Sequence, residues 1–346
     1  MKIIRSTAFF ALFALALTFT ACTSATEPKT KTYYEYFDTV STVTSYAKES
    51  EAQFDENAAA VEDSLKNYHR LFDVYYEYSG INNLKTVNDN AGVTPVKVDS
   101  AIIDLLLYAK EIYTLTRGET NVAMGSVLRL WHEERQNASD GKNAALPSDD
   151  SLKNAAKHTF IDSLIIDEGA STVFVSDPSA SIDVGAIAKG YAVERTAELL
   201  ESRGAESYVL NVGGNIRMIG AKPDGKGWIT GITDPQKREG GFALRLILSN
   251  TSCVTSGNYE RYYTVDGKNY HHIIDKDTLY PAAYFASVSV ITPDSALADA
   301  LSTALFCMTY EEGIELVGSL EGTEVIWIYE NGNIKTTDGI KDLTAK

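Results

Sequence analysis

The sequence predicts an α+β protein with mixed, largely antiparallel sheets and packed helices. Apolar residues recur at helical spacing in residues 52–72 and 100–116, which is typical of amphipathic helices. From residue 160 onward, short segments rich in β-branched and aromatic residues are separated by turn residues. Helices and strands do not alternate regularly, which disfavours a doubly wound parallel sheet. The chain has 346 residues, 44% hydrophobic and 23% charged, enough for one large domain or two smaller ones.

The N-terminal half is predicted to be mainly helical after an initial strand. Residues 33–47 are rich in Tyr, Thr and Val, and they predict that strand. Helices are predicted at residues 52–72, 100–116 and 122–134. Residues 136–150 contain Asn, Asp, Gly and Pro, and they predict a surface loop.

The C-terminal half is predicted to consist of short strands and three helices. The longest helix is expected at residues 186–203, where Gly204 ends it. Residues 208–219 predict a strand interrupted by Gly213-Gly214, which suggests a bulge or a close approach of the backbone to a neighbour or ligand. Asp266-Gly267 is a typical hairpin turn. The remaining strands are expected at 227–233, 242–248, 259–265, 270–274, 285–291, 324–329 and 334–336, and the remaining helices at 294–308 and 310–320.

The net charge excludes one broad class of partner and limits another. Lys and Arg number 31 against 47 Asp and Glu, a formal net charge of −16. Nucleic acid is not an expected partner, because clustered Lys and Arg are needed to hold a phosphate backbone. An anionic ligand requires a local reversal of the field by a metal, a helix N-terminus or a few cations.

Residues 1–21 predict a secretory signal peptide rather than part of the fold. Lys2 and Arg5 form a short positive region, and the apolar run that follows is too short for a transmembrane helix. Ala21 precedes Cys22, as a small residue does in the lipobox of bacterial lipoproteins. Cys22 is therefore the expected site of lipid attachment and the expected mature N-terminus. An ordinary signal peptide with a chance cysteine is the alternative.

A polar tether is expected at residues 22–31, followed by one domain at residues 32–346. After Cys22 the sequence holds only Cys253 and Cys307. Two thiols do not make a disulfide framework, although an exported chain permits one bridge. We expect two buried, inert thiols.

Residues 182–191 combine the end of a strand, glycines and a helix that carries a lysine. Asp183 ends the strand, Gly185 follows it, and Lys189 lies in the first part of the helix. Small residues let a ligand approach the backbone, and a helix N-terminus with a nearby cation favours an anion. The alternative is an N-capped helix with a solvated lysine.

Residues 294–304 predict a helix face with two hard oxygen donors. Asp299 and Thr303 are four residues apart, so carboxylate and hydroxyl share a face that is otherwise lined by alanine. Such oxygens suit Mg²⁺ and leave coordination positions for water and phosphate. In the alternative, Asp294 caps the helix and Asp299 is merely exposed.

Two of the five histidines, His271 and His272, adjoin a predicted strand. Neighbouring side chains of a strand point to opposite faces, so one could act as a base in a site while the other is solvated. The alternative is a pair of packed or exposed histidines without a chemical role. With no further His or Cys nearby, a zinc site is not indicated.

Taken together, these segments resemble the ApbE family, the FAD:protein FMN transferases. The matching stretches follow the family's order and span nearly the whole chain after Cys22. The resemblance implies an ApbE-like, T-fold-related flavin transferase domain at residues 32–346. The matching stretches are 37–40, 72–75 with Ser79 and Ile81, 116–118, 127–131, 183–191, 211–215, 255–261, 271–275 and 294–304.

The resemblance implies roles for individual residues. Asp299 and Thr303 match the metal-binding carboxylate and hydroxyl, and the backbone carbonyl of Ala186 matches a third Mg²⁺ ligand. His272 matches the catalytic histidine, and Asp299 is counted with it as catalytic. Flavin contacts are implied at Phe37, Tyr75, Glu119, Thr120, Asn121, Asp183, Lys189 and His272.

Two stretches depart from the family's pattern. Glu119-Thr120-Asn121 stands where the family often has Ala-Phe-Asp, and Asn121 cannot supply a negative charge. Thr278-Leu279 stands where the family often has Thr-Gly, which changes a turn near His272.

The resemblance also implies the reaction, which is transfer of FMN from FAD to a Thr or Ser hydroxyl of a target protein, with Mg²⁺ required and AMP released. The implied partners are FAD, acceptor flavoproteins such as subunits of membrane redox complexes, and the membrane through a lipid anchor. The expected location is the extracytoplasmic face of the bacterial cell membrane, which is the periplasmic side of the inner membrane where an outer membrane exists. The alternatives are a Mg²⁺-dependent FAD pyrophosphatase that yields FMN and AMP, a non-catalytic FAD-binding lipoprotein and a generic solute-binding lipoprotein.

Overall fold

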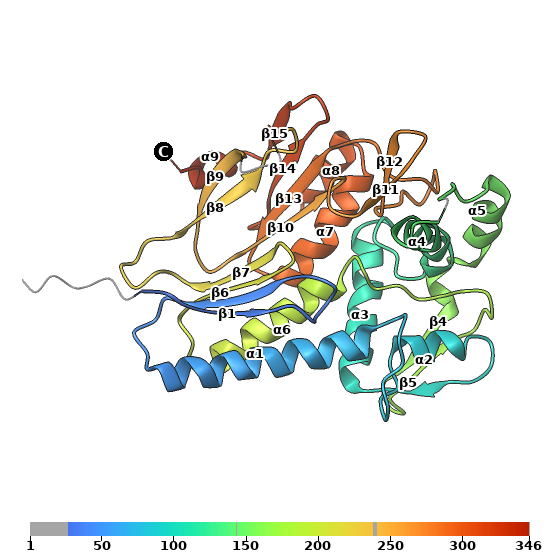
Figure 1. Ribbon diagram of the computed structural model, residues 1–346, viewed down its shortest axis with the longest axis horizontal. Helices are drawn as coiled ribbons and strands as arrows, with labels where there is room; N and C mark the ends of the chain where they lie inside the picture. Colours follow the sequence, from blue (N-terminus) through green and yellow to red (C-terminus); the bar gives the residue numbers. More distant parts are fainter. Residues whose placement is uncertain (1–26, 143, 238–240, 346) are drawn as a thin grey trace, which may run out of the picture.

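The computed structural model describes residues 27–142, 144–237 and 241–345. Its centre is an eight-stranded sheet in which every neighbouring pair of strands is antiparallel (Figure 1). The predicted α+β class with largely antiparallel sheets is confirmed. The strands, in spatial order, are β1 (Lys29–Tyr33), β2 (Ser41–Ser45), β6 (Ser207–Val212), β7 (Asn215–Gly220), β10 (Ser252–Gly257), β13 (Ser287–Thr292), β14 (Glu324–Ile328) and β15 (Ile334–Thr336).

Helices cover one face of this sheet. α6 (Ala188–Ser202) packs beside β6 and β7, and α1 (Glu51–Phe72) lies beside α6 (Figure 1). α7 (Ser295–Cys307) packs against β10 and β13, and α8 (Tyr310–Val317) against β14. The predicted helices at 52–72 and 310–320 are therefore confirmed, with α8 slightly shorter than expected.

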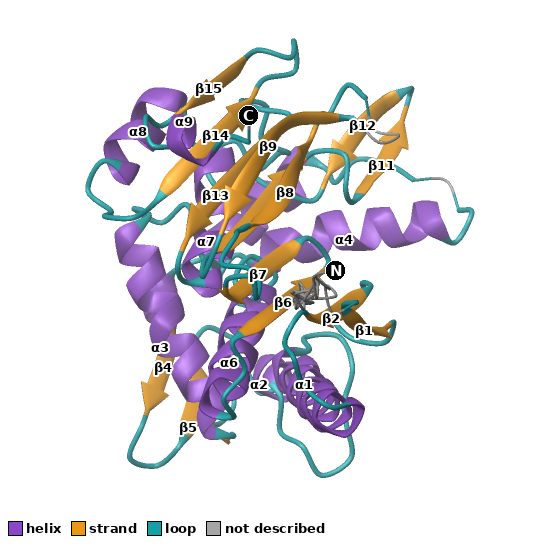
Figure 2. Cartoon of the chain, turned by 90° about the vertical axis from the view of Figure 1, so that its left-hand side faces the viewer, coloured by secondary structure: helices purple, strands orange, loops and turns teal. Residues whose placement is uncertain are grey.

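The opposite face of the central strands is covered by a second, smaller layer. Alternate residues of β10, β13 and β14 point either to α7 and α8 or to this layer, so both faces of these strands are buried. The layer consists of the hairpin β8 (Trp228–Thr233) and β9 (Phe242–Leu248) with α9 (Ile340–Leu343) (Figure 2).

The rest of the described chain forms two small sheets with their own helices. β3 (Val96–Lys97), β5 (Thr172–Val175) and β4 (Leu164–Asp167) form one sheet beside α2 (Leu84–Asp89) and α3 (Ser100–Leu115). β11 (Tyr262–Val265) and β12 (Lys268–His271) form a hairpin beside α4 (Gly125–Ser139). The predicted Asp266-Gly267 turn connects them, with φ of 49° and 78°.

The segment 33–47, predicted as one strand, is a strand pair with a loop between. Phe37 and Asp38 have φ of 55° and 51°, left-handed values that interrupt extended backbone and reverse the chain between β1 and β2. The tether predicted at residues 22–31 is also too long, because Lys29 already pairs with Ser45 in the sheet. The predicted signal peptide, Cys22 and the start of the tether lie outside the described residues.

Gly213-Gly214 is a hairpin turn rather than an interruption within one strand. The two glycines have φ of 56° and 91°, as the two-residue turns that join antiparallel strands require, and they connect β6 to β7. The expected close approach is present as well, since a Cβ on Gly213 would lie 2.5 Å from Thr39 Oγ1.

Other boundaries differ where local propensity was a poor guide. The predicted surface loop at 136–150 is shortened from both ends, by α4, which continues to Ser139, and by α5 (Asp149–Ala155). β10 had no prediction because its sequence, SCVTSG, is dominated by small residues and lacks a bulky β-type pattern. Cys253 and Cys307 are buried and unpaired, as predicted, and burial raises the pKa of the Cys253 thiol to about 12.

Candidate active site

One cavity of about 630 Å³ lies between α4, α6, α7, β8 and the loops that follow β1 and α3. It contains every described residue that the sequence singled out for flavin, metal or catalysis, except Phe37. Those residues are Tyr75, Glu119, Thr120, Asn121, Asp183, Ala186, Lys189, His272, Asp299 and Thr303. The fold thus brings together segments that are far apart in the sequence, while the role of each residue remains a prediction.

The Asp299 carboxylate is held between α7 and α6. Asp299 is buried, which excludes the alternative that it is merely exposed, although Asp294 does cap α7. Asp299 Oδ2 accepts a hydrogen bond of 2.8 Å from the backbone N–H of Gly190, and Oδ1 lies 3.4 Å from Lys189 Nζ. Lys189 is therefore paired with a carboxylate at the cavity, and it is not a solvated lysine.

Three oxygen donors of the cavity have the chemistry of a hard-cation site. They are the Asp299 carboxylate, the Thr303 hydroxyl one turn further along α7, and the backbone carbonyl of Ala186 just before α6. Within the ranges that the structure describes, no group of three or more His, Cys, Asp or Glu side chains could hold a metal. A donor set with a single carboxylate suits a cation that keeps several waters and takes further oxygens from a substrate.

The imidazole of His272 lines the cavity with a defined tautomer. Nδ1 lies 3.2 Å from the carbonyl oxygen of Arg261. A carbonyl can only accept, so Nδ1 carries the proton and Nε2 keeps a free lone pair. Burial, and then the positive charges of Arg261 and Arg135, lower the pKa of His272 to about 3. The ring is therefore neutral at ordinary pH.

His271 points the other way, as the alternation of a strand predicts. It is buried, its Nε2 donates a hydrogen bond of 2.9 Å to the carbonyl of Ala282, and its ring contacts Phe306 edge-on. Burial lowers its pKa. His271 is a core residue, so the two adjacent histidines divide into one packed and one cavity-facing side chain.

The wall formed by Tyr75 and α4 carries a cluster that sequence reasoning missed. The rings of Tyr75 and His132 stack at 4.4 Å and 21°, and Arg135 Nη2 lies 3.0 Å from His132 Nδ1. Burial is the main cause that lowers the pKa of both His132 and Arg135. The only sequence signal was that these two residues are three apart on one helix face, with Arg135 just past the predicted helix end.

Asp183 lies near this cluster and is held by its own turn. Its Oδ1 accepts a hydrogen bond of 2.8 Å from the backbone N–H of Gly185. Burial raises the pKa of Asp183, although this hydrogen bond and the charges of His132 and Arg135 act in the opposite direction. The cavity therefore combines a desolvated carboxyl with several cations, on a chain of net charge −16.

The polar side chains of residues 119–121 form hydrogen bonds and an ion pair with neighbouring parts of the protein. Thr120 Oγ1 donates to the carbonyl of Ala300 at 2.9 Å, and Asn121 Nδ2 donates to the carbonyl of Thr159 at 2.9 Å. Glu119 pairs with Lys276 at 3.1 Å, while burial raises its pKa.

Phe37 is absent from the residues that line the described cavity. Its ring packs edge-on against His69 with centroids 5.7 Å apart, and its carbonyl accepts a hydrogen bond of 3.3 Å from Arg261. The next residues, Asp38 and Thr39, do line the cavity. Phe37 thus supports a loop at the site, and its predicted flavin contact has no counterpart in the described cavity wall.

Known proteins are similar to this chain in sequence and in architecture. The ApbE family model matches residues 37–327. An FAD:protein FMN transferase of Treponema pallidum is 33% identical over 273 residues, which cover 75% of this chain and 74% of that protein. An FAD:protein FMN transferase of Klebsiella pneumoniae is 30% identical over 278 residues, which cover 80% of this chain and 83% of that protein.

Solved structures agree with the ApbE-like architecture. The ApbE protein of Thermotoga maritima matches with a TM-score of 0.80 at 28% identity, covering 92% of this chain and 100% of that chain. The flavin transferase ApbE of Vibrio cholerae matches with a TM-score of 0.76 at 23% identity, covering 91% of this chain and 99% of that chain, and it bears on the fold alone. On the family match and the curated relatives, this chain belongs to the ApbE family.

Proposed function

We propose that the protein transfers FMN from FAD to a Thr or Ser hydroxyl of an acceptor protein and releases AMP. The curated relatives of T. pallidum and K. pneumoniae are named for this transfer. The observation that carries the proposal is a single cavity lined by a neutral imidazole, a lysine and the oxygen donors of Asp299 and Thr303. Its volume of about 630 Å³ lies in the range of cavities that enclose a sizeable organic ligand.

Mg²⁺ is the cation that we propose for this reaction. The Asp299 carboxylate, the Thr303 hydroxyl and the Ala186 carbonyl would hold it, because all three are hard oxygens at one cavity. When bound, such a cation neutralises pyrophosphate charge. Lys189, 3.4 Å from Asp299 Oδ1, adds a second positive charge beside the same place.

The chemical step replaces the phosphoanhydride bond of FAD by a phosphoester bond to the acceptor protein. The acceptor's hydroxyl oxygen forms a bond to the FMN-side phosphorus of FAD, and the bond from this phosphorus to the bridging oxygen breaks, so that AMP leaves with that oxygen. The hydroxyl proton passes to His272 Nε2, the ring nitrogen left free by the Nδ1 contact with the Arg261 carbonyl. His272 and the cavity thereby orient the acceptor and remove its proton.

The cations around His272 make the basicity of its imidazole depend on whether FAD is bound. With the cavity free, Arg261, Arg135 and Lys189 contribute to the low pKa of this imidazole. A bound FAD brings the negative charge of its pyrophosphate among these cations, which offsets their effect and raises the pKa of His272. The imidazole is then a better proton acceptor when the substrate is present than when it is absent.

We further propose that the protein is a lipid-anchored enzyme on the extracytoplasmic face of the bacterial cell membrane. The support comes from the sequence, in which Lys2, Arg5 and an apolar run precede Ala21-Cys22. Such an anchor would bring the cavity close to acceptor flavoproteins in membrane redox complexes. Labelling of cells with a palmitate analogue should mark the full-length protein and fail to mark Cys22→Ser. Equal labelling of the variant would refute the anchor.

The transfer itself is tested by following flavin into a protein band. The protein is mixed with FAD, Mg²⁺ and candidate acceptor domains, and flavin fluorescence is read after a denaturing gel. A labelled acceptor band that disappears with EDTA or with Asp299→Ala supports the transferase. Conversion of FAD to FMN and AMP without any label would instead indicate a pyrophosphatase, and FAD that binds but stays intact would indicate a binding protein.

A further inference from the structure

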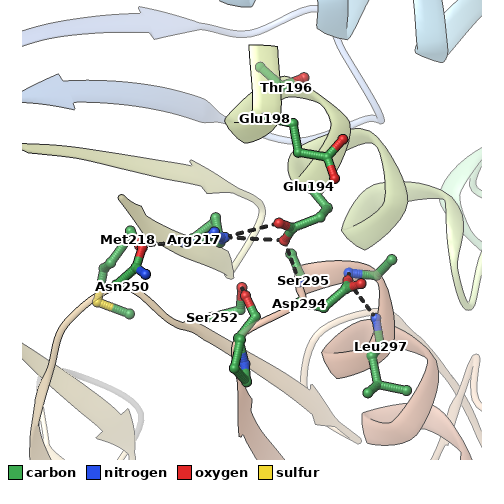
Figure 3. Close-up of polar contacts among 12 residues, drawn as sticks. Glu194, Thr196, Glu198, Arg217, Met218, Asn250, Ser252, Asp294, Ser295 and Leu297 are labelled. Carbon is green, nitrogen blue, oxygen red and sulfur yellow. Dashed lines mark hydrogen bonds and ion pairs between the residues drawn. The ribbon is translucent and has the colours of Figure 1, made fainter. Parts of the chain in front are cut away.

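A buried ion pair lies behind the cavity, between α6 and β7. Glu194 of α6 and Arg217 of β7 are each only 6% exposed, and neither belongs to the residues that line the described cavity. Arg217 Nε lies 3.3 Å and 3.2 Å from the two oxygens of the Glu194 carboxylate (Figure 3). Removing one partner of such a pair leaves the other charge buried and unpaired, which is costly.

The Glu194 carboxylate also contacts the first residue of α7. Its Oε2 accepts a hydrogen bond of 2.6 Å from the backbone N–H of Ser295 (Figure 3). The first N–H groups of a helix have no partner within the helix. Asp294, the N-cap, accepts from the next two residues of α7, and Glu194 takes the N–H that Asp294 leaves. A second carboxylate at this end also interacts favourably with the positive pole of the helix dipole.

α6 and α7 are therefore joined at two points that are one helical turn apart. Gly190 donates its backbone N–H to Asp299 Oδ2 at 2.8 Å, and Ser295 donates its backbone N–H to Glu194. Gly190 and Glu194 are four residues apart on α6, and Ser295 and Asp299 are four residues apart on α7. The Gly190 bond ends on the Asp299 carboxylate, which lines the cavity. The Ser295 bond to Glu194 therefore determines the position from which α7 presents that carboxylate.

Between these two bonds the helices touch through backbone. A Cβ on Gly190 would lie 2.3 Å from the carbonyl oxygen of Ser295 and 2.4 Å from Asp299 Cβ. No flexible side chain separates α6 from α7 at this contact. Any shift of the first turn of α7 is therefore passed directly to Asp299.

Arg217 is the counter-charge of the Glu194 carboxylate in this buried position. Burial raises the pKa of Glu194, and the Ser295 N–H and Arg217 offset only part of this rise. The guanidinium has two further contacts. It lies 3.3 Å from Glu201, and it donates a hydrogen bond to the carbonyl of Met218 (Figure 3). The pair of Glu194 and Arg217 is thus built into the junction of β7, α6 and α7.

We propose that Glu194, paired with Arg217 and bonded to the Ser295 N–H, is a positioning residue that sets how α7 presents Asp299 and Thr303 to a cation in the cavity. The inference rests on the proposed function, which makes Asp299 and Thr303 cation ligands. It goes further by assigning cation affinity to a residue that does not touch the cavity.

Two variants weaken the Glu194 contact by different routes. Glu194→Gln keeps the shape and removes the charge. Ser295→Pro removes the N–H and the hydroxyl, and its ring displaces the Glu194 oxygen that now lies 2.6 Å from this nitrogen. It does so at a helix position where proline is well tolerated. The backbone of Asp294, with φ of −97° and ψ of 121°, already suits a residue that precedes proline. Ser295 Oγ has no partner among the described side chains, so its loss breaks no hydrogen bond.

The readout is direct binding of Mn²⁺, followed by electron paramagnetic resonance in the presence of FAD with the full-length protein, beside transfer rates at saturating Mg²⁺. We expect each variant to bind Mn²⁺ about 10- to 100-fold more weakly, as is typical when a residue that orients a ligand is changed. The transfer rate at saturating Mg²⁺ should stay within about threefold, because the ligands themselves are intact. Glu198→Gln is the matched control, since Glu198 is on the same helix but is half exposed and pairs with Arg195 on the surface.

Comparing the parent protein with Asp299→Asn distinguishes failure of the proposed cation site from failure of the positioning role of Glu194. If Asp299→Asn binds Mn²⁺ as tightly as the parent, the proposed cation site is wrong and the positioning role falls with it. If Asp299→Asn loses binding while Glu194→Gln and Ser295→Pro keep the affinity of the parent, only the positioning role is overturned. If Glu194→Gln does not fold, Ser295→Pro alone decides.

Discussion

Two parts of the cavity wall are built in different ways. The helix wall, comprising Ala186, Lys189, Asp299 and Thr303, is fixed by backbone contacts between α6 and α7. The aromatic wall, comprising Tyr75, His132, Arg135 and Asp183, depends on the stacking of Tyr75 on His132 and on a hydrogen bond between His132 and Arg135 within α4. The first arrangement is closely packed, whereas Tyr75 is 43% exposed. This contrast suggests that the helix wall performs the chemistry on the pyrophosphate and the aromatic wall receives the flavin.

The largest effect is expected from the helix wall. Asp299→Ala removes the only carboxylate among the three proposed Mg²⁺ ligands, and a bound cation supplies several kcal/mol to such a transition state. Transfer should fall by about 10⁴-fold or more, to the background of the gel assay. Full activity of this variant in Mg²⁺ would contradict the assignment of the helix wall.

A smaller loss is expected at His272, between the two walls. His272→Gln keeps a polar side chain but removes the free ring nitrogen, and a general base typically contributes about 10²- to 10⁴-fold. Single-turnover rates with saturating FAD and acceptor should show this loss, while FAD binding changes little. A loss below about threefold would show that another group takes the proton.

The aromatic wall should affect binding more than rate. Arg135→Met removes a partly buried cation beside Tyr75 and His132, and a hydrogen bond to a charged group is worth about 1.5–3 kcal/mol. We expect KM for FAD to rise about tenfold or more with little change in kcat. Arg129→Met is the matched control, because Arg129 lies on the same helix and is exposed. Equal effects of both substitutions would argue against flavin binding at this wall.

The smallest expected effect is a flat response to pH. Burial and the nearby cations lower the pKa of His272 to about 3, so the neutral ring persists as pH falls from 8 to 5. In the free enzyme the active form would be lost only as pH approaches 3, because the rise in the His272 pKa that we propose requires bound FAD. Pre-steady-state rates with free enzyme and limiting FAD should show no ionisation between pH 5 and 8. An apparent pKa near 6.5 that is absent in His272→Gln would contradict this.

Sequence reasoning reached the helix wall because its signals are local. Asp299 and Thr303 share a face through helical spacing, and the division between His271 and His272 follows from strand alternation. At the aromatic wall Tyr75 and Asp183 were predicted through the resemblance, whereas His132 and Arg135 were missed because Tyr75 and α4 meet only in the folded chain. His132 and Arg135 have the pattern of an ordinary solvated helix face.

The same reasoning could not find Glu194 and Arg217. A charged residue on an amphipathic helix and another on a strand are usually exposed, and only the sheet that brings β7 beneath α6 buries them together. The loop at Phe37 could not be predicted either, because its left-handed backbone conformation occurs at residues other than glycine. Local patterns thus predicted the elements and their faces, and tertiary contacts decided which charges became buried.

The most direct measurement of the division between the two walls is ³¹P NMR of FAD bound to the protein, with Mn²⁺ added in the absence of acceptor. A paramagnetic ion at Asp299 and Thr303 should broaden both phosphorus resonances strongly. We expect Asp299→Asn to abolish the broadening and Arg135→Met, at saturating FAD, to leave it intact. Broadening that survives in Asp299→Asn, or that disappears only in Arg135→Met, would contradict a helix wall that holds the cation and the pyrophosphate.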